Sequence, residues 1–162
     1  MKFNFTGEKI PIVLSSYFAY MRFEDSKYFH EFKHVKVEFS FGNIYFFDKF
    51  ILSEINEGVH FDWEKIEEVI AFAMDHYGPS FKIAYISNRV NSYSLDPHSW
   101  SRFQDELDHI VASAIVYYSY INFMNASIEK LFSPSSMKRC ETLEEAMEWV
   151  QNLREFQRIN QN

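Results

Sequence analysis

From about residue 50 onward, strand-like and helix-like segments alternate along the chain, and this alternation limits the possible folds more than any other feature. One segment has apolar residues at helical spacing, at Trp63, Ile66, Ile70, Ala73 and Tyr77. The run from Phe81 to Ile86 that follows it is apolar and of strand length. A helix that links two strands of one sheet makes a crossover connection, so the strands lie parallel. The sequence therefore predicts an α/β fold.

The segment before this alternation predicts antiparallel strands. Apolar and polar residues alternate from Val35 to Phe41, as in a strand with one face in water. Gly42-Asn43 is typical of a turn, and the segments Ile44 to Phe47 and Phe50 to Ile55 follow it. We expect these strands to form an N-terminal antiparallel meander.

The second half of the chain predicts three further helices and two further strands. Asp96-Pro97 is typical of a helix start, and the buried face of that helix would carry Trp100, Phe103, Leu107 and Ile110. Val111 to Tyr118 is apolar without alternation, so we expect a strand at the centre of the sheet. A helix from about Asn122 to Phe132 and an edge strand near Met137 to Cys140 follow. Thr142 and Glu145 form a capping box at the start of the last helix.

These elements predict a mixed sheet of about five or six strands with about four helices. We expect a single α/β domain over residues 33–158, preceded by an aromatic-rich arm over residues 1–32. The arm is too apolar to remain in water, because it carries Tyr17, Phe18, Tyr20, Phe23, Tyr28, Phe29 and Phe32. We expect it to pack on the domain or on a second copy, which predicts a homo-oligomer.

Composition and charge exclude several classes of partner. The chain has 16 Lys and Arg against 23 Asp and Glu, a formal net charge of -7, which repels nucleic acid and anionic lipid. The apolar run from Ile10 to Tyr20 is too short to span a bilayer and lacks a cleavage pattern, so we expect no membrane insertion. Cys140 is the single cysteine, which excludes an intramolecular disulfide and favours a reducing, cytoplasmic location.

The polar loop after the Phe81 strand is the candidate functional site. In open α/β sheets, ligands bind beyond the carboxyl ends of the strands. The candidate residues for binding a ligand or a partner are Asn88, Arg89, Asn91, Ser92, Tyr93, Ser94 and Asp96. The Arg89 guanidinium offers a fork of donors to an anionic group. Alternatively, Arg89 pairs with Glu54, Glu57 or a nearby helix carboxylate, and the polar side chains only satisfy the turn.

The chemical motifs do not favour catalysis. His30-Glu31-Phe32-Lys33-His34 has the spacing of a zinc protease helix, but the strand that begins at or beside His34 leaves no room for that helix. We therefore expect no metal and no cofactor. We interpret Cys140 as an inert thiol, because no histidine lies next to it in the sequence. The chain has four glycines and no glycine-rich phosphate loop, so we expect no nucleotide hydrolysis. Taken together, these motifs lead us to expect no enzyme activity.

Several blocks of the sequence resemble one known family. They include Phe41-Gly42, the segment Glu54 to Val59, Tyr85 to Arg89 with Asn91 to Ser94, Ala114 to Val116, and Leu143 to Ala146 with Trp149. Over roughly residues 35–156 the chain resembles the SpoIIAA-like, STAS-type domain proteins, which are common as small uncharacterised bacterial proteins. The resemblance implies a sheet flanked by helices and a role in protein–protein regulation.

The resemblance also implies a candidate modification site. In the anti-sigma-factor antagonists of that superfamily, a serine at the start of a helix is phosphorylated to break a partner complex. Ser92 or Ser94 lies in the comparable place, where a phosphate would meet free N–H groups of a helix N-terminus. The Asp-Ser-Ser-Gly type of motif is replaced here by Asn91-Ser92-Tyr93-Ser94.

Two functions from different classes follow. The first is a non-enzymatic regulatory or interaction module of STAS type that binds an unknown partner protein through the loop after the central strand. The second is a binding domain for a small anionic or apolar ligand, or a weak enzyme, with a pocket under the same loop. Tyr85, Tyr93 and Trp100 would line that pocket.

Overall fold

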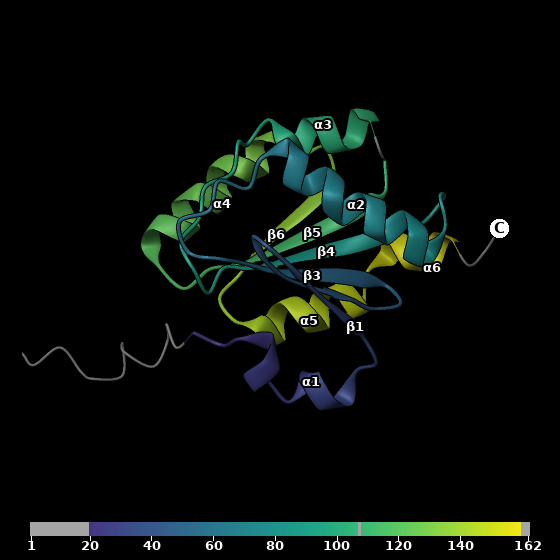
Figure 1. Ribbon diagram of the computed structural model, residues 1–162, viewed down its shortest axis with the longest axis horizontal. Helices are drawn as coiled ribbons and strands as arrows, with labels where there is room; N and C mark the ends of the chain where they lie inside the picture. The colour runs from purple at the N-terminus through teal and green to yellow at the C-terminus, as the bar shows by residue number, and fades with distance from the viewer. Residues whose placement is uncertain (1–19, 107, 160–162) are drawn as a thin grey trace, which may run out of the picture.

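A computed structural model describes residues 20–106 and 108–159. A single six-stranded sheet forms its centre, with the strands in the order in which they occur along the chain (Figure 1). The strands are β1 (Val35–Phe39), β2 (Gly42–Phe46), β3 (Phe50–Ile55), β4 (Ile83–Asn88), β5 (Ile110–Val116) and β6 (Ser136–Cys140). The helices are η2 (Phe23–Asp25), α1 (Tyr28–Glu31), α2 (Trp63–Tyr77), α3 (Ser99–Glu106), α4 (Tyr120–Phe132), α5 (Leu143–Gln151) and α6 (Arg154–Ile159).

The sheet is mixed, as the sequence predicts. β1, β2 and β3 pair antiparallel, whereas β3, β4, β5 and β6 pair parallel through helical crossovers. The meander and the parallel portion together confirm the predicted α/β fold class. The turn between β1 and β2 lies at Ser40-Phe41 rather than at Gly42-Asn43, because Gly42 already pairs with Phe39 and Ile55.

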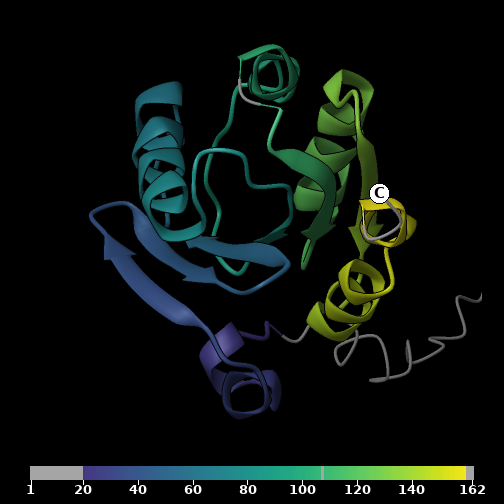
Figure 2. The ribbon, with the colours of Figure 1, turned by 90° about the vertical axis from the view of Figure 1, so that its right-hand side faces the viewer.

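Helices cover the sheet on both faces, and Figure 2 shows α2, α3 and α4 on one side with α1 and α5 on the other. α2 begins and ends at Trp63 and Tyr77, the first and last residues of the apolar pattern in the sequence, and the Asp62 side chain caps it by accepting a hydrogen bond from the Lys65 N–H. At α5, Thr142 accepts from the Glu145 N–H, but the Glu145 carboxylate accepts from the Glu141 N–H instead of completing a capping box.

The prediction of a central position for the Val111 strand is wrong. β5 lies next to the edge strand β6, and β3 and β4 form the middle of the sheet. The side chains of β5 from Ala112 to Val116 are nevertheless buried, because α4 and α5 cover the two faces there. Burial on both faces produces an uninterrupted apolar run at any inner position of a sheet. Ile110 belongs to β5 and not to the preceding helix.

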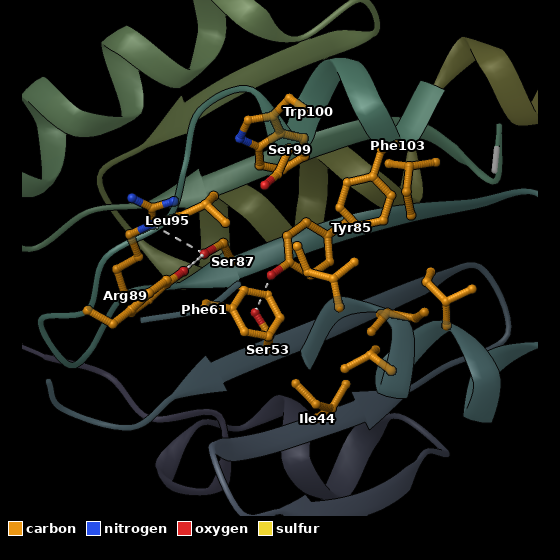
Figure 3. A pocket seen from close by; sticks show the side chains of 16 residues that line it. Ile44, Ser53, Phe61, Tyr85, Ser87, Arg89, Leu95, Ser99, Trp100 and Phe103 are labelled. Atoms are coloured by element: carbon orange, nitrogen blue, oxygen red, sulfur yellow. Dashed lines mark hydrogen bonds between the residues drawn. The ribbon is translucent and has the colours of Figure 1, made fainter. Parts of the chain in front are cut away.

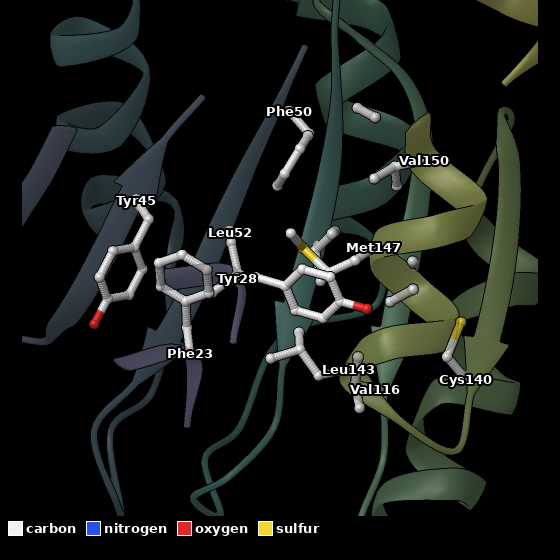
Figure 4. Packing of buried hydrophobic residues seen from close by; sticks show 14 of the residues in the cluster. Phe23, Tyr28, Tyr45, Phe50, Leu52, Val116, Cys140, Leu143, Met147 and Val150 are labelled. Atoms are coloured by element: carbon white, nitrogen blue, oxygen red, sulfur yellow. The ribbon is translucent and has the colours of Figure 1, made fainter. Parts of the chain in front are cut away.

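The N-terminal segment from residue 20 packs against the face that α5 covers. Phe23 and Tyr28 belong to the same buried cluster as Leu52, Val116 and Met147 (Figure 4). The Phe23 ring makes edge contacts with Tyr45 and Phe47. Other residues for which the sequence makes predictions lie outside the described part of the chain, namely Tyr17 and Phe18 of the arm, most of the Ile10 to Tyr20 run, and Leu107. Each helix of the described ranges is too short or too polar to cross a membrane.

Candidate functional site

The loop after β4 leaves the sheet at the carboxyl end of the strand, as the sequence predicts. Successive side chains of a strand point to opposite faces, so Ser87 and Arg89 face α2, α3 and α4 whereas Asn88 faces the N-terminal segment. The candidate residues therefore separate into two groups on opposite faces of the sheet. A third group, Asn91, Ser92, Ser94 and Asp96, lies at the outer edge of the loop, which we call the rim.

Arg89 is held inside the protein by a carboxylate of α4. Its Nη1 and Nη2 lie 2.7 and 2.8 Å from the two oxygens of Glu129, and the side chains are 4% and 3% exposed. The Trp100 indole N–H donates to the same carboxylate at 2.9 Å. The sequence leaves Glu54, Glu57 and a helix carboxylate open as partners of Arg89, and the structure contains the pairing with a helix carboxylate. The guanidinium fork is thus already engaged with an anionic group of the protein itself.

The surroundings of Arg89 keep it charged. Burial opposes its charge, but the paired Glu129 carboxylate favours it, and the pKa of Arg89 lies above its usual value. The guanidinium carbon lies 5.2 Å from the centre of the Tyr93 ring, a cation–π contact. Burial also raises the pKa of Tyr93, although Arg89 opposes that shift, so the phenol stays neutral.

A small cavity lies beneath the loop, between the sheet and the helices α2 and α3. Its volume is about 40 Å³ (Figure 3). Tyr85, Tyr93 and Trp100, the three aromatic residues that the sequence places around a pocket here, all line it. The remaining wall is mostly apolar, with Ile44, Ile51, Phe61, Ile66, Leu95 and Phe103 among its residues. A space of this size holds a few water molecules.

Two hydroxyl pairs form the polar part of the cavity wall. Ser53 Oγ lies 2.5 Å from the Tyr85 hydroxyl, and Ser87 Oγ lies 2.7 Å from the Tyr93 hydroxyl (Figure 3). Arg89 Nε also donates to Ser87 Oγ at 3.3 Å. Burial raises the pKa of Tyr85, so its hydroxyl, like that of Tyr93, remains protonated and able to donate. The wall therefore offers neutral hydroxyl donors and acceptors to a small molecule, and a charged group that is already paired.

A depression of about 190 Å³ on the outer side of the loop shares three residues with the cavity, namely Arg89, Tyr93 and Leu95. Its other walls come from the loop residues Ser94 and Pro97 and from α4, including Ile128 and Glu129. The Arg89–Glu129 pair therefore lies between the cavity and this depression.

The rim is hydrogen-bonded to the end of β3 and to the loop between β3 and α2. Asn91 Nδ2 donates to the Ile55 carbonyl at 2.8 Å, and the Ser92 N–H donates to Glu57 Oε2 at 2.6 Å. Ser94 Oγ lies 2.8 Å from His60 Nδ1. Ser92 and Ser94 are both exposed.

The helix after this rim begins at Ser99, later than the sequence predicts. Asp96 accepts a hydrogen bond from the His98 N–H in the turn before α3, and this bond helps to hold its pKa below the usual value. Ser92 and Ser94 consequently lie several residues away from the first turn of α3. A phosphate on Ser92 would lie beside the Glu57 carboxylate, whereas one on Ser94 would lie beside His60.

A second buried polar cluster lies on the opposite face and joins the sheet to the N-terminal segment. Asn88 Nδ2 donates to Glu54 Oε1 at 2.6 Å, and the Phe23 N–H donates to the same oxygen at 2.7 Å. The Tyr118 hydroxyl donates to Asn88 Oδ1 at 2.7 Å. Burial raises the pKa of Glu54 even though these hydrogen bonds act in the opposite direction. We call Glu54, Asn88 and Tyr118 the anchor cluster. Asn88 is thus a residue of this cluster and not of the cavity.

Sequence reasoning missed Glu129, Ser53 and Ser87 as residues of the site. Glu129 occurs within a helix, where a carboxylate is ordinarily exposed, and only the tertiary packing of α4 shows that it is buried. One signal was available, because Ser53 and Ser87 are polar residues within mainly apolar strands. Polar residues in such strands indicate either a paired group or a cavity.

His30, His34 and Cys140, which the sequence analysis considers for metal binding and nucleophilic chemistry, are not arranged for either role. α1 ends at Glu31 and Phe32 is extended, so His30 and His34 do not share a helical face. The His34 ring instead packs against Phe23 and Phe29. Within residues 20–106 and 108–159, no group of His, Cys, Asp and Glu could hold a metal ion. Burial raises the pKa of the Cys140 thiol to about 12, which keeps it protonated and unreactive.

Comparison with known proteins gives a similarity in fold. No protein-family model matches the chain, and no curated protein matches it significantly in sequence. A solved structure of an uncharacterised DUF3478-family protein from Shewanella loihica PV-4, described as having a SpoIIAA-like fold, is similar to it. The match covers 73% of this chain and 92% of that one, with 15% identity and a TM-score of 0.43.

Proposed function

We propose that the protein is a non-enzymatic binding module that takes a small, largely apolar ligand with one hydroxyl or carbonyl group into the cavity beneath the β4 loop. The observation that supports this proposal is the convergence of two hydroxyl pairs, Ser53–Tyr85 and Ser87–Tyr93, on a mostly apolar wall. Ligand sites commonly combine a mainly apolar lining with a few placed polar groups.

The chemistry of the wall favours binding over catalysis. Among the described residues that line the cavity, the tyrosines have raised pKa values and Arg89 stays charged and paired. A general base or acid works best with a pKa near the operating pH. Neutral hydroxyls can orient a hydroxyl or carbonyl of a ligand, because they both donate and accept hydrogen bonds.

Binding requires α3 to move, because the cavity is much smaller than the several hundred Å³ of a ligand site. α3 covers the cavity with few buried residues: of its eight residues, only Ser99 and Trp100 are buried. Elements with few buried contacts open at low free-energy cost. We expect the ligand to pass through the outer depression and to displace α3 and the adjoining loop.

Ligand-induced thermal stabilisation of three proteins tests this function. p-Cresol, which carries an aromatic ring and one hydroxyl, is added to the unaltered chain, to Tyr93→Phe and to Tyr117→Phe. We expect the Tm of the unaltered chain and of Tyr117→Phe to rise with ligand concentration, because binding to the folded state stabilises it. Tyr93→Phe should show a clearly smaller rise, since it loses a hydroxyl of the wall. Tyr117 lies outside the cavity and bonds Glu141, so it is the matched control.

Two outcomes of this experiment would overturn the ligand proposal. One is an unchanged Tm in all three proteins up to saturating p-cresol. The other is an equal rise in all three, which would place binding away from the hydroxyl wall.

The exposed rim supports a second candidate function, the binding of a partner protein through the loop. Ser92, Ser94 and Asp96 are exposed there, whereas Asn88 and Arg89 are buried and already hydrogen-bonded. A partner would therefore contact the rim and not the guanidinium. Titration of an isotope-labelled sample with a partner isolated by pull-down should shift the backbone NMR signals of the rim residues and leave those of the cavity residues unchanged.

A further inference from the structure

α4 carries an apolar stripe on its outer face that nothing within the described residues covers. The stripe consists of Tyr120, Ile121, Met124, Ile128 and Leu131, which are 42 to 83% exposed. These positions follow a three- and four-residue spacing and so lie on one side of the helix. The opposite side, with Asn122, Ala126 and Glu129, faces the protein interior.

The stripe is large enough to require an explanation. Its five side chains expose on the order of 500 Å² of apolar surface, which is at the upper end for an ordinary surface patch of a monomer. It contains no charged residue, although about a quarter of the chain is charged. An area of this size is below the roughly 800 Å² per partner that a stable protein–protein interface buries.

The described chain begins close to the first turn of this helix. The Tyr20 ring packs 5.3 Å from the ring of Tyr118, two residues before α4 begins. The Met21 carbonyl accepts hydrogen bonds from Asn88 Nδ2 and from the Tyr118 hydroxyl. The anchor cluster therefore fixes residues 20 and 21 beside the N-terminal end of α4, and with them the point at which residues 1–19 join the described chain.

The composition of the preceding residues matches the stripe. The run from Ile10 to Ala19 contains no charged residue and carries Ile10, Ile12, Val13, Leu14, Tyr17 and Phe18. Ten residues in extended conformation span about 33 Å, and the thirteen residues of α4 span about 20 Å. The run is therefore long enough to reach from Tyr20 to Leu131.

We propose that residues 10–19 dock on the apolar stripe of α4 in the same molecule. Tethering favours this occupant, since a linked segment is present at a millimolar effective concentration without a second molecule. A second copy would bring another net charge of -7 to a surface of modest area. Ile128 also lines the depression outside the cavity, so the docked segment would lie along the edge of that depression.

Protection of a cysteine on the stripe tests the proposal in the full chain. Leu131→Cys adds one exposed thiol, whereas the native Cys140 is fully buried and does not compete for reagent. We expect a maleimide to label the introduced thiol roughly ten times more slowly than it does after Ile12→Asp and Leu14→Asp are added, because the charged segment would no longer dock. A cysteine introduced by Glu68→Cys on α2 should be labelled at the same rate in both backgrounds.

The dependence on protein concentration separates the two possible occupants. Docking within one molecule predicts the same protection over about a hundredfold range of concentration. Protection that grows with concentration would assign the stripe to a second copy and overturn the proposal. Equal labelling of Leu131→Cys with and without the Asp substitutions would overturn it as well.

Disulfide cross-linking of a variant that carries both Val13→Cys and Leu131→Cys is an independent test of docking within one molecule. Mild oxidation should produce a cross-linked monomer that migrates faster on a non-reducing gel, and Val13→Cys with Glu68→Cys should not. A covalent dimer as the main product, or no difference between the two pairs, would contradict docking within one molecule.

Discussion

At the scale of single residues, the Arg89–Glu129 ion pair holds the start of the β4 loop in place over the cavity. Both side chains are almost fully buried, and Glu129 also accepts from the Trp100 indole of α3. The pair thus links the loop after β4 to α3 and α4 through one carboxylate. Removing one member of a buried pair leaves an uncompensated charge in a medium of low dielectric.

Replacing Glu129 with Leu should lower the free energy of unfolding by about 3 to 5 kcal/mol, because the guanidinium stays buried without a partner. Urea unfolding measures the loss, with Glu148→Leu at an exposed position of α5 as the control. The double change Arg89→Met with Glu129→Leu should recover most of it, since both charges are then absent. A loss below about 1 kcal/mol for Glu129→Leu, typical of an exposed pair, would contradict a structural role.

The anchor cluster predicts a pH dependence of stability. The pKa of Glu54 is raised in the folded protein above its ordinary value of 4.5, so the folded state favours the protonated carboxyl. Its contribution is therefore fully present below pH 4.5 and is lost as the pH rises through the folded pKa. Stability curves from pH 4 to pH 8 should show this fall in the unaltered chain and in Glu57→Gln, where the carboxylate is exposed. In Glu54→Gln the corresponding fall should be absent, and an identical fall in all three proteins would refute the assignment to Glu54.

At the scale of elements, the close contact between β2 and β3 explains the glycine at the start of β2. A Cβ on Gly42 would lie 2.6 Å from the Glu54 carbonyl oxygen and 2.8 Å from the Ile55 Cα. Both are backbone atoms of β3, which cannot move away without disturbing the ladder and the position of Glu54 in the anchor cluster. The glycine therefore permits the strand spacing that holds this part of the sheet together.

Gly42→Ala should lower the free energy of unfolding by about 1 to 3 kcal/mol through this overlap. Chemical unfolding provides the measurement, and Asn43→Ala at the next position of the same strand is the control. If both alanine variants were equally stable, β2 and β3 would not approach as closely as described.

The boundaries of the helices and the order of the strands show which parts of the fold can be predicted from the sequence. Asp62, the five-residue apolar pattern and Gly78 determine α2 locally, so the helix coincides with the span of the pattern from Trp63 to Tyr77. The start of α3 is less well defined by its sequence, because Asp96 and Pro97 form a turn that precedes the first helical residue. The position of β5 in the sheet depends on which strands pair, and strand order is not encoded in the apolar pattern of a single strand.

At the scale of the whole molecule, the two faces of the sheet have different structural roles. One face is covered by α5 and the N-terminal segment, with Phe23 and Tyr28 packed in the buried cluster between them (Figure 4). The anchor cluster joins the sheet to the N-terminal segment on this face. The other face is covered by α2, α3 and α4 and contains the cavity (Figure 3). β4 and its loop contribute to both faces, because alternate side chains point in opposite directions.

The sequence predicts the position of the site but not its internal contacts. The location at the carboxyl end of β4 follows from the α/β class, and the aromatic lining of Tyr85, Tyr93 and Trp100 is confirmed. The partner of Arg89 could not be deduced, since Glu129 lies 40 residues away and its burial depends on the packing of α4. Long-range pairing of this kind depends on tertiary geometry, which local patterns do not contain.

The central claim, that the cavity beneath the β4 loop receives a small hydroxyl-bearing ligand, is tested most directly by the indole N–H signals in a proton–nitrogen correlation spectrum. The chain has three tryptophans, and Trp100 is the one that lines the cavity. On titration with p-cresol, the Trp100 signal should shift in a saturable way while the signals of Trp63 and Trp149 change little. A Trp100 signal that stays in place, or equal shifts of all three signals, would contradict the account.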